Sequence, residues 1–96
     1  MDERNRIILL YDYYGELLSS SQKEYFEKYY FDNLSLSEIS ENLNVSRNAV
    51  HKQLKSVEEK LQFYDEKLNL IKKYNKVLDE IKDDNLKEII TEILES

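Results

Sequence analysis

Apolar residues recur three and four positions apart along most of the chain, which is the spacing that one face of an α-helix produces. The first face predicts a helix over about residues 3–18, and the aromatic residues at 25–30 predict a second. A short third pattern covers about 36–43, a long one runs from 47 toward 82, and the last covers 86–94. We therefore expect an all-α fold, a small helical domain with a helix-turn-helix, followed by a long helix and a C-terminal helix.

Serine and asparagine residues mark the expected helix ends, because the chain contains no Pro and a single Gly. Ser21 and Glu24 fit a Ser-x-x-Glu capping box, in which each side chain bonds a free backbone amide of the first helical turn. Gly15 falls inside the first predicted helix, where Gly costs roughly 1 kcal/mol relative to Ala. Either a neighbour packs closely against Gly15 or the helix is weak there, and we favour simple tolerance of the residue.

The middle of the chain predicts a short helix, a tight turn and a second helix. Ser35 and Glu38 form another capping box at the start of the short helix. Asn44 follows the last turn of that helix, and Asn accepts the left-handed conformation that a sharp helix end requires. Val45 then supplies an apolar plug, and Ser46 is a favourable N-cap for the second helix. The apolar positions of this unit are spaced for one inner face: Ile39, Leu43, Val45, Val50, Leu54 and Val57.

The outer face of the second helix carries basic and hydrogen-bonding side chains and no acid. A helix-turn-helix presents the amino-terminal half of its second helix to the major groove of DNA. There Arg47 could pair with a guanine edge or a phosphate, and Asn48 with an adenine edge, while Ser46 and the helix amino terminus could hold a phosphate. Lysines on this face would contact the backbone without reading sequence. The alternative is an ordinary solvated helix face. The candidate nucleic-acid-binding residues are Ser46, Arg47, Asn48, His51, Lys52 and Lys55.

The charge distribution places this local cationic face in an acidic chain. Twenty acids and fourteen bases give a net charge of −6, which argues against a general nucleic-acid coat protein. Residues 1–46 carry four bases and nine acids (−5), residues 47–76 eight bases and four acids (+4), and residues 77–96 two bases and seven acids (−5). Acidic flanks should repel other phosphates, so a specific target or a protein partner is favoured over indiscriminate coating.

Two family resemblances rest on these residues. The segment EISENLNVSRNAVHKQL, residues 38–54, resembles the helix-turn-helix in the promoter-reading carboxy-terminal region of bacterial sigma factors. A second resemblance spans nearly the whole chain and includes the aromatic first helix, the YYFDNLSLSEI entry and the VSRNAV turn in order. By these features the chain is similar to the YlxM family of small helix-turn-helix proteins. It departs from that family at Gly15 and in its short acidic tail.

The YlxM resemblance implies a sigma-like helix-turn-helix fold and a place in the signal recognition particle pathway, since family members are encoded beside components of that particle. Carried over by position, the recognition-helix candidates are Arg47, Asn48, His51 and Lys52. Two functions follow as hypotheses. The chain is a regulatory protein that binds duplex DNA, or it is an adaptor that binds the particle's RNA or protein without sequence-specific DNA binding.

Aromatic residues are concentrated at the start of the chain, with six of the eight Tyr and two of the three Phe before residue 32. A platform that stacks single-stranded bases needs interleaved cations. The neighbours here include Asp12, Glu16 and Glu27. We therefore favour aromatic packing between the first two helices.

The carboxy-terminal half predicts an interaction element. Apolar positions from Val50 to Leu78 recur in steps of four and three, as in a heptad seam, with Asn75 in one slot. The long helix either continues past Asn69 or bends there, and the last helix either folds back on its own chain or meets another protomer. A homodimer would suit palindromic half-sites. We expect a helical domain over 1–61, with the helix-turn-helix at about 35–60, and a C-terminal extension over 62–96 that serves as an interaction or dimerisation element. The residues expected at the partner or dimer interface are Leu61, Tyr64, Leu68, Ile71, Leu78, Ile89, Ile90 and Ile93.

Catalytic chemistry is not expected. His51 is the single His, Cys is absent, and no Gly-rich phosphate loop occurs, so we predict neither an enzyme nor a bound cofactor or metal. No apolar run approaches the length of a membrane span, and the acidic start lacks a basic signal-peptide region. We expect a cytoplasmic protein without membrane insertion.

Overall fold

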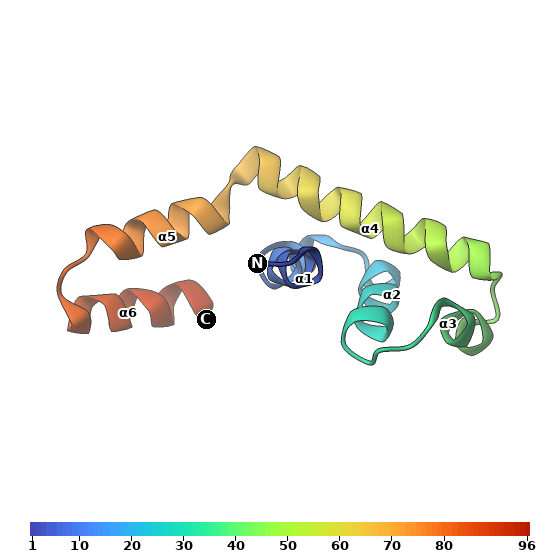
Figure 1. Cartoon of the computed structure of the whole chain (residues 1–96). Helices are drawn as coiled ribbons and strands as arrows, with labels where there is room; N and C mark the ends of the chain where they lie inside the picture. Colours follow the sequence, from blue (N-terminus) through green and yellow to red (C-terminus); the bar gives the residue numbers. More distant parts are fainter.

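The computed structural model describes residues 1–96 and contains helices and no strands, which confirms the all-α prediction. Figure 1 shows α4 and α5 meeting at a bend, with α1, α2 and α3 beneath α4 and α6 beneath α5. A 3-10 turn, η1, follows the first helix. The bounds are α1 Glu3–Tyr14, η1 Gly15–Leu17, α2 Ser20–Tyr30, α3 Leu36–Leu43, α4 Arg47–Leu68, α5 Leu70–Glu80 and α6 Asp84–Glu95.

The first helix is shorter than predicted. α1 ends at Tyr14, and the chain tightens into η1 at Gly15 instead of continuing to residue 18. Gly15 is buried, and a Cβ built there would lie 3.1 Å from ring carbons of Tyr11. The expectation of simple tolerance is therefore wrong, because an aromatic ring packs directly against the glycine.

The cap of α2 lies two residues earlier than predicted. Ser19 is the N-cap: its hydroxyl accepts the Gln22 amide at 3.2 Å, and the Gln22 side chain accepts the Ser19 amide at 3.0 Å. Ser21 lies inside the helix, so the box predicted from Ser21 and Glu24 is wrong. Three consecutive serines offered alternative caps, and Gln22 completes a box with the first of them.

Two apolar clusters form the core beneath α4. The smaller one joins α2, α3 and α4 through Tyr25, Ile39, Val50 and Leu54. The half-buried ring of Tyr29 packs against both clusters and links them. The larger cluster consists of Ile7, Leu10, Tyr14, Leu18, Phe26, Tyr30, Val57, Leu61 and Ile71.

Aromatic rings pack α1 against α2, as the sequence predicted. Tyr11 stacks on Phe26 with 4.1 Å between ring centroids and 5° between planes, and Phe26 stacks on Tyr30 at 4.5 Å. Phe31 meets both Tyr11 and Phe26 edge-on. These rings serve as structural packing between helices.

The long helix bends at Asn69, which decides between the two alternatives that the sequence left open. Asn69 takes a left-handed conformation, with φ 52° and ψ 40°, and α5 starts at the next residue. The Tyr14 hydroxyl accepts the Leu70 amide at 2.9 Å and donates to the Asp65 carboxylate at 2.6 Å. Arg6 pairs with the same carboxylate at 2.7 Å. The bend is thus held by side chains of α1.

The predicted heptad seam turns toward its own chain over most of α4, because α1, α2 and α3 cover that face. Of the predicted interface residues, Leu61 and Ile71 lie in the core and are not available to a partner. Leu68, Ile89 and Ile93 are exposed. The half-buried members are Tyr64, Leu78 and Ile90.

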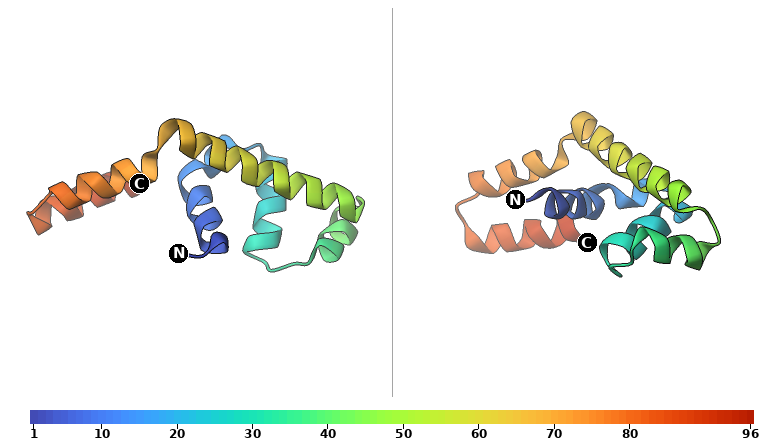
Figure 2. Two further views of the ribbon diagram at one scale, coloured as in Figure 1. Left: turned by 45° about the horizontal axis from the view of Figure 1, so that its top comes forward. Right: turned by 45° about the vertical axis from the view of Figure 1, so that its right-hand side comes forward.

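α5 and α6 form a helical hairpin, residues 70–96, which we call the arm. Asp83 caps α6 by accepting the amides of Asn85 and Leu86. A break is present as predicted, but it covers residues 81–83, and Asp84 and Asn85 already belong to α6. α6 runs back along α5 toward α1, so the arm projects beside the other helices (Figure 2). The molecule is elongated, with extents of 52 × 24 × 24 Å.

Candidate nucleic-acid interface

The helix-turn-helix consists of α3, a three-residue turn and the first half of α4. The capping box predicted at its start is present: the Ser35 hydroxyl accepts the Glu38 amide at 3.1 Å, and Glu38 accepts the Ser35 amide at 3.0 Å. The bond from the Ser35 amide lowers the pKa of the Glu38 carboxyl. Asn44 ends α3 in the left-handed conformation, with φ 55° and ψ 48°, which confirms the predicted turn.

Ser40 closes the turn and was missed in the sequence. Its backbone carbonyl accepts the amide of Val45 at 3.1 Å, and its hydroxyl donates to the Val45 carbonyl at 2.8 Å. A serine in the last turn of a helix gives no strong sequence signal, because serines also occupy exposed helix positions without a role. The bond fixes the path by which the chain leaves α3 and enters α4.

The inner face of the unit is buried as predicted at four of six positions. Ile39, Val50 and Val57 are fully buried, and Leu54 is nearly so. Leu43 is half-buried. Val45 is 36% exposed, so its predicted role as an apolar plug is wrong. The left-handed turn at Asn44 places Val45 outside the space between α3 and α4.

The amino terminus of α4 presents free backbone donors to solvent. Ser46 is the N-cap, as predicted, and its hydroxyl accepts the Ala49 amide at 3.0 Å, while its carbonyl accepts the Val50 amide. The amides of Arg47 and Asn48 have no acceptor within the protein. Free amides at a helix start carry partial positive charge and bind anions well.

The predicted nucleic-acid-binding side chains gather at this end of the molecule. Arg47, Asn48 and His51 line a shallow hollow together with Leu36 from the first turn of α3. Asn48, His51, Lys52 and Lys55 follow the i, i+3, i+4, i+7 spacing, so they share one solvent face of α4. All six predicted residues, Ser46, Arg47, Asn48, His51, Lys52 and Lys55, are exposed.

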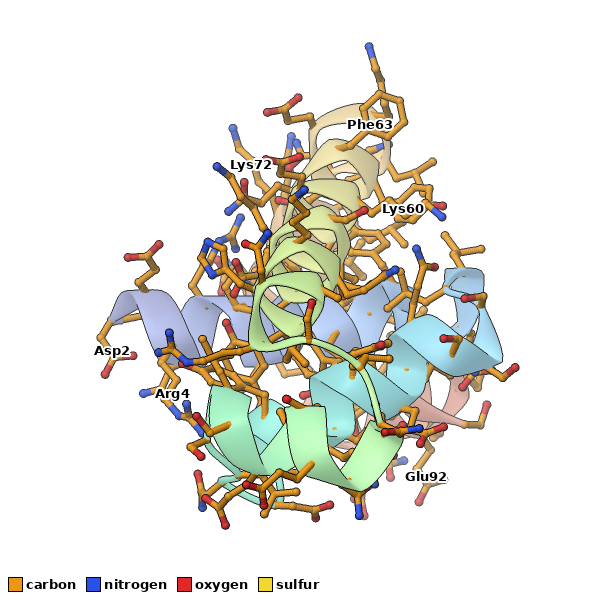
Figure 3. All side chains as sticks on the ribbon, turned by 90° about the vertical axis from the view of Figure 1, so that its right-hand side faces the viewer. Asp2, Arg4, Lys60, Phe63, Lys72 and Glu92 are labelled. Carbon is orange, nitrogen blue, oxygen red and sulfur yellow. The ribbon has the colours of Figure 1, made fainter.

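No other element covers this end. In Figure 3, which looks onto it, the start of α4 is nearest the viewer, α3 lies below it, and the labelled Glu92 of α6 lies behind. In the same view Lys60 of α4 is labelled on one side of the α4 ribbon and Lys72 of α5 on the other.

The cationic side chains of the candidate interface form no ion pair within the chain. The three ion pairs of the chain join Arg6 to Asp65, Lys23 to Glu16 and Lys28 to Glu24, and none includes a residue of the candidate interface. The side chains of Arg47, His51, Lys52 and Lys55 also donate no hydrogen bond to the protein, so their charge is available to a ligand. The exposed carboxylates of Glu38 and Glu41 on α3 would repel phosphates, which restricts the directions from which a phosphate can approach the site.

No group of three or more His, Cys, Asp or Glu side chains is arranged to hold a metal ion. None of the helices combines the length and the apolar character that crossing a membrane would require.

Comparison with known proteins gives one family. The sequence model of the UPF0122 family, described as "Putative helix-turn-helix protein, YlxM / p13 like", matches residues 1–95. A UPF0122 protein of Caldanaerobacter subterraneus subsp. tengcongensis is 49% identical over 82 residues, covering 85% of this chain and 68% of that protein. UPF0122 proteins of Thermoanaerobacter sp. and Listeria monocytogenes serovar 1/2a are 47% and 48% identical over 73 residues, 76% of this chain. Those residues cover 62% and 66% of the two proteins, so the match spans about two thirds of the curated relatives.

Proposed function

The chain belongs to the UPF0122 family of YlxM/p13-like helix-turn-helix proteins, and from that premise we propose that it is a non-enzymatic regulatory protein that binds duplex DNA. The contacts would come from the amino-terminal half of α4. A helix-turn-helix is a fold that typically binds nucleic acid and does not typically catalyse reactions, although a fold by itself does not determine function.

One observation carries the proposal: the exposed start of the second helix combines free backbone amides with cations that no protein acid neutralises. Arg47 can pair with a guanine edge or a phosphate, Asn48 can pair with an adenine edge, and the amides beneath them can hold a phosphate. Lys52 and Lys55 would contact the backbone and fix the register of the helix in the groove. We propose that His51 also contacts the major groove of the DNA.

The acidic segments on either side of residues 47–76 favour selective binding over indiscriminate binding of nucleic acid. Residues 1–46 and 77–96 each carry a net charge of −5, whereas residues 47–76 carry +4. A phosphate backbone is therefore attracted at α4 and α5 and repelled elsewhere. The proposal puts the protein in the cytoplasm, where a DNA ligand resides.

Fluorescence anisotropy with a random-sequence duplex tests the proposed face. On a duplex that only one protomer contacts, four phosphate contacts give a slope of about −3.6 for log K against log salt, and removing two of them reduces its magnitude to about 1.8. We expect Arg47→Ala/Lys52→Ala to show that loss. Lys60→Ala/Lys67→Ala is the matched control, because it removes the same charge from α4 away from the interface. Equal binding by wild type and Arg47→Ala/Lys52→Ala would show that this face of α4 does not bind the duplex.

The second candidate is an adaptor in the signal recognition particle pathway. It is favoured by cations outside the helix-turn-helix: Lys72, Lys73 and Lys76 of α5 are exposed and join no ion pair. Such a surface would suit the particle's RNA or an acidic protein surface. In this alternative the helix-turn-helix provides structure and partner contacts without reading DNA sequence.

A side-by-side titration separates the two candidates. Duplex DNA and the particle's RNA are titrated at two salt concentrations, and the particle's protein is used as bait in a pull-down. Tighter binding to duplex, with no retention by the particle components, supports the DNA-binding regulator. Retention on the particle, with weak duplex binding that Arg47→Ala does not change, supports the adaptor.

A homodimer is part of the proposal for either ligand. Two helix-turn-helix units in one assembly would double the number of phosphate contacts and match palindromic half-sites. The expected dimerisation extension, residues 62–96, contains the arm.

A further inference from the structure

The arm leaves most of its apolar side chains uncovered. α6 buries none of its residues, and Leu86, Ile89 and Ile93 are 47%, 47% and 65% exposed. On α5, Leu70 and Val77 are also exposed. A soluble helix carries an apolar stripe in order to bury it against another element. Within this chain only Ile90 of the α6 stripe is half-buried, and Leu86, Ile89 and Ile93 are left uncovered.

A groove opens where α1, α5 and α6 converge. Its volume is about 740 Å³, and its lining is mainly apolar: Leu9, Tyr13, Leu70, Tyr74, Val77 and Leu94. Tyr13 and Tyr74 meet edge-on at 6.1 Å, and the Tyr74 hydroxyl donates to Glu95 at 3.2 Å, which ties α1, α5 and α6 together around it. The rim carries both signs of charge, with Lys73 on one helix and Asp12 and Glu95 on the other two.

The uncovered stripe of α6 has the spacing that such grooves accept. Peptide helices that dock into apolar grooves use anchors at i, i+3, i+4 and i+7. Leu86, Ile89, Ile90 and Ile93 follow that spacing. The chain thus carries both a groove and an anchor helix, and the exposure of Ile89 and Ile93 shows that the two do not satisfy each other within one protomer.

The surface area that this chain exposes beyond that of a compact monomer is similar to the area that one partner buries in a protein interface. The chain exposes 6874 Å², whereas a compact monomer of this mass exposes about 5,800 Å². The excess of about 1,000 Å² compares with about 800 Å² that each partner buries in a standard interface. The radius of gyration is 16.3 Å, against about 12.5 Å for a compact domain of this length.

We propose that the arm is an isologous dimerisation surface, in which α6 of one protomer docks its stripe into the groove of a second copy and receives the partner's α6 in return. This inference specifies the dimer included in the proposed function, and the surface is separate from the helix-turn-helix.

A second copy fits better than an unrelated protein because the surface is complementary to itself. Groove and anchor helix occur on the same chain, so one two-fold contact covers both at once. The charges agree: α5 carries Lys72, Lys73 and Lys76 without ion-pair partners, and α6 carries Glu88 and Glu92, also unpaired. An acidic α6 approaching the partner's basic α5 is attracted to it.

Sedimentation equilibrium of the whole chain tests the dimer. We expect wild type to have twice the 11.6 kDa chain mass and to dissociate on dilution. Ile93→Asp should remain monomeric at concentrations where wild type is dimeric, because the charge would be buried in the partner's groove. Leu17→Asp is the matched control, since Leu17 is also exposed (53%) and lies outside the arm. Circular dichroism of both variants should match wild type.

Three results would overturn the inference. Wild type stays monomeric at every concentration, Ile93→Asp dimerises as wild type does, or Leu17→Asp dissociates as readily as Ile93→Asp. The readout is independent of nucleic acid: loss of duplex binding with an intact dimer counts against the proposed function alone, and a monomer that still binds duplex counts against the arm alone.

Discussion

At the residue scale, Tyr14 shows how one polar group fixes the path of the chain. Its hydroxyl lies between the Asp65 carboxylate and the Leu70 amide, at the bend that separates α4 from the arm. The ring is fully buried, so its hydrogen bonds have no water to replace them. The position of the arm therefore depends on a side chain from α1, more than fifty residues earlier in sequence.

We expect Tyr14→Phe to lower the free energy of unfolding by about 1–3 kcal/mol, because it leaves the Leu70 amide and part of the Asp65 carboxylate without a partner. Urea denaturation measures the change. Tyr13→Phe is the control, since Tyr13 is half-buried in the same helix and its hydroxyl makes no hydrogen bond, and it should cost much less. Similar losses in both variants would mean that the polar network does not stabilise the bend.

Tyrosine hydroxyls also make stability fall at high pH. Burial, together with a hydrogen bond to Glu58, raises the pKa of Tyr30, and burial with a bond to Glu27 raises the pKa of Tyr11. The unfolded chain thus loses these protons first, near its ordinary Tyr pKa of about 10. Because the folded pKa is the higher one, this stabilisation is fully present below that pH and is lost as pH rises toward the folded pKa.

We therefore expect the free energy of unfolding, measured by urea at stepped pH, to decline above about pH 10. The pKa values of Tyr13 and Tyr14 are raised as well, mainly by burial, so Tyr30→Phe removes one of four such groups and should make the decline shallower, although the variant starts less stable. A decline of the same steepness in Tyr30→Phe would show that other groups cause it.

At the element scale, the turn between α3 and α4 depends on the left-handed conformation of Asn44. Side chains with a Cβ pay roughly 1–2 kcal/mol in that conformation, and β-branched ones fit it worst. We expect Asn44→Val to lower the free energy of unfolding by about that amount and to weaken duplex binding through a displaced α4. Asn44→Gly should retain both stability and binding. If Asn44→Val is as stable as wild type, the turn tolerates another conformation.

The elements that could be predicted from sequence are those with local signals. The cap at Ser35, the turn at Asn44 and the cap at Ser46 each depend on neighbours within four residues, and all three are confirmed. The same holds for the break at residue 83 and for the exposed basic face of α4. Local hydrogen bonding and helical spacing were enough to place the two helices and the turn of the helix-turn-helix, but not the Ser40 bond or the exposure of Val45.

Other features could not be predicted because they depend on contacts between residues far apart in sequence. Leu61 and Ile71 continue an apolar seam whose spacing is typical of an interface with a partner chain. In the structure both residues are instead covered by α1 and α2. The bend at Asn69 likewise lies where Tyr14 of α1 holds the amide of Leu70, which is far from it in sequence. Periodicity gives the apolar face of a helix but not the element that covers it.

At the scale of the whole molecule, charge and shape separate two surfaces. The basic start of α4 lies at one end of an elongated chain, and the acidic α6 lies in the arm (Figure 1). A dimer joined through the arms would leave both recognition helices uncovered. Nucleic-acid binding and self-association can then be measured separately and also combined.

The salt dependence of duplex binding connects the two surfaces. A monomer with four phosphate contacts gives a log–log slope of about −3.6, and a dimer that places both α4 helices on one duplex gives about −7. We expect wild type to show the steeper slope on a long duplex, and Ile93→Asp to show the shallower one with its helix-turn-helix unchanged. Leu17→Asp should follow wild type.

Anisotropy titrations at stepped salt measure all three slopes, and a steep slope retained in monomeric Ile93→Asp would mean that one chain makes all the contacts. In that case α5, with its unpaired lysines, would have to lie on the duplex beside α4.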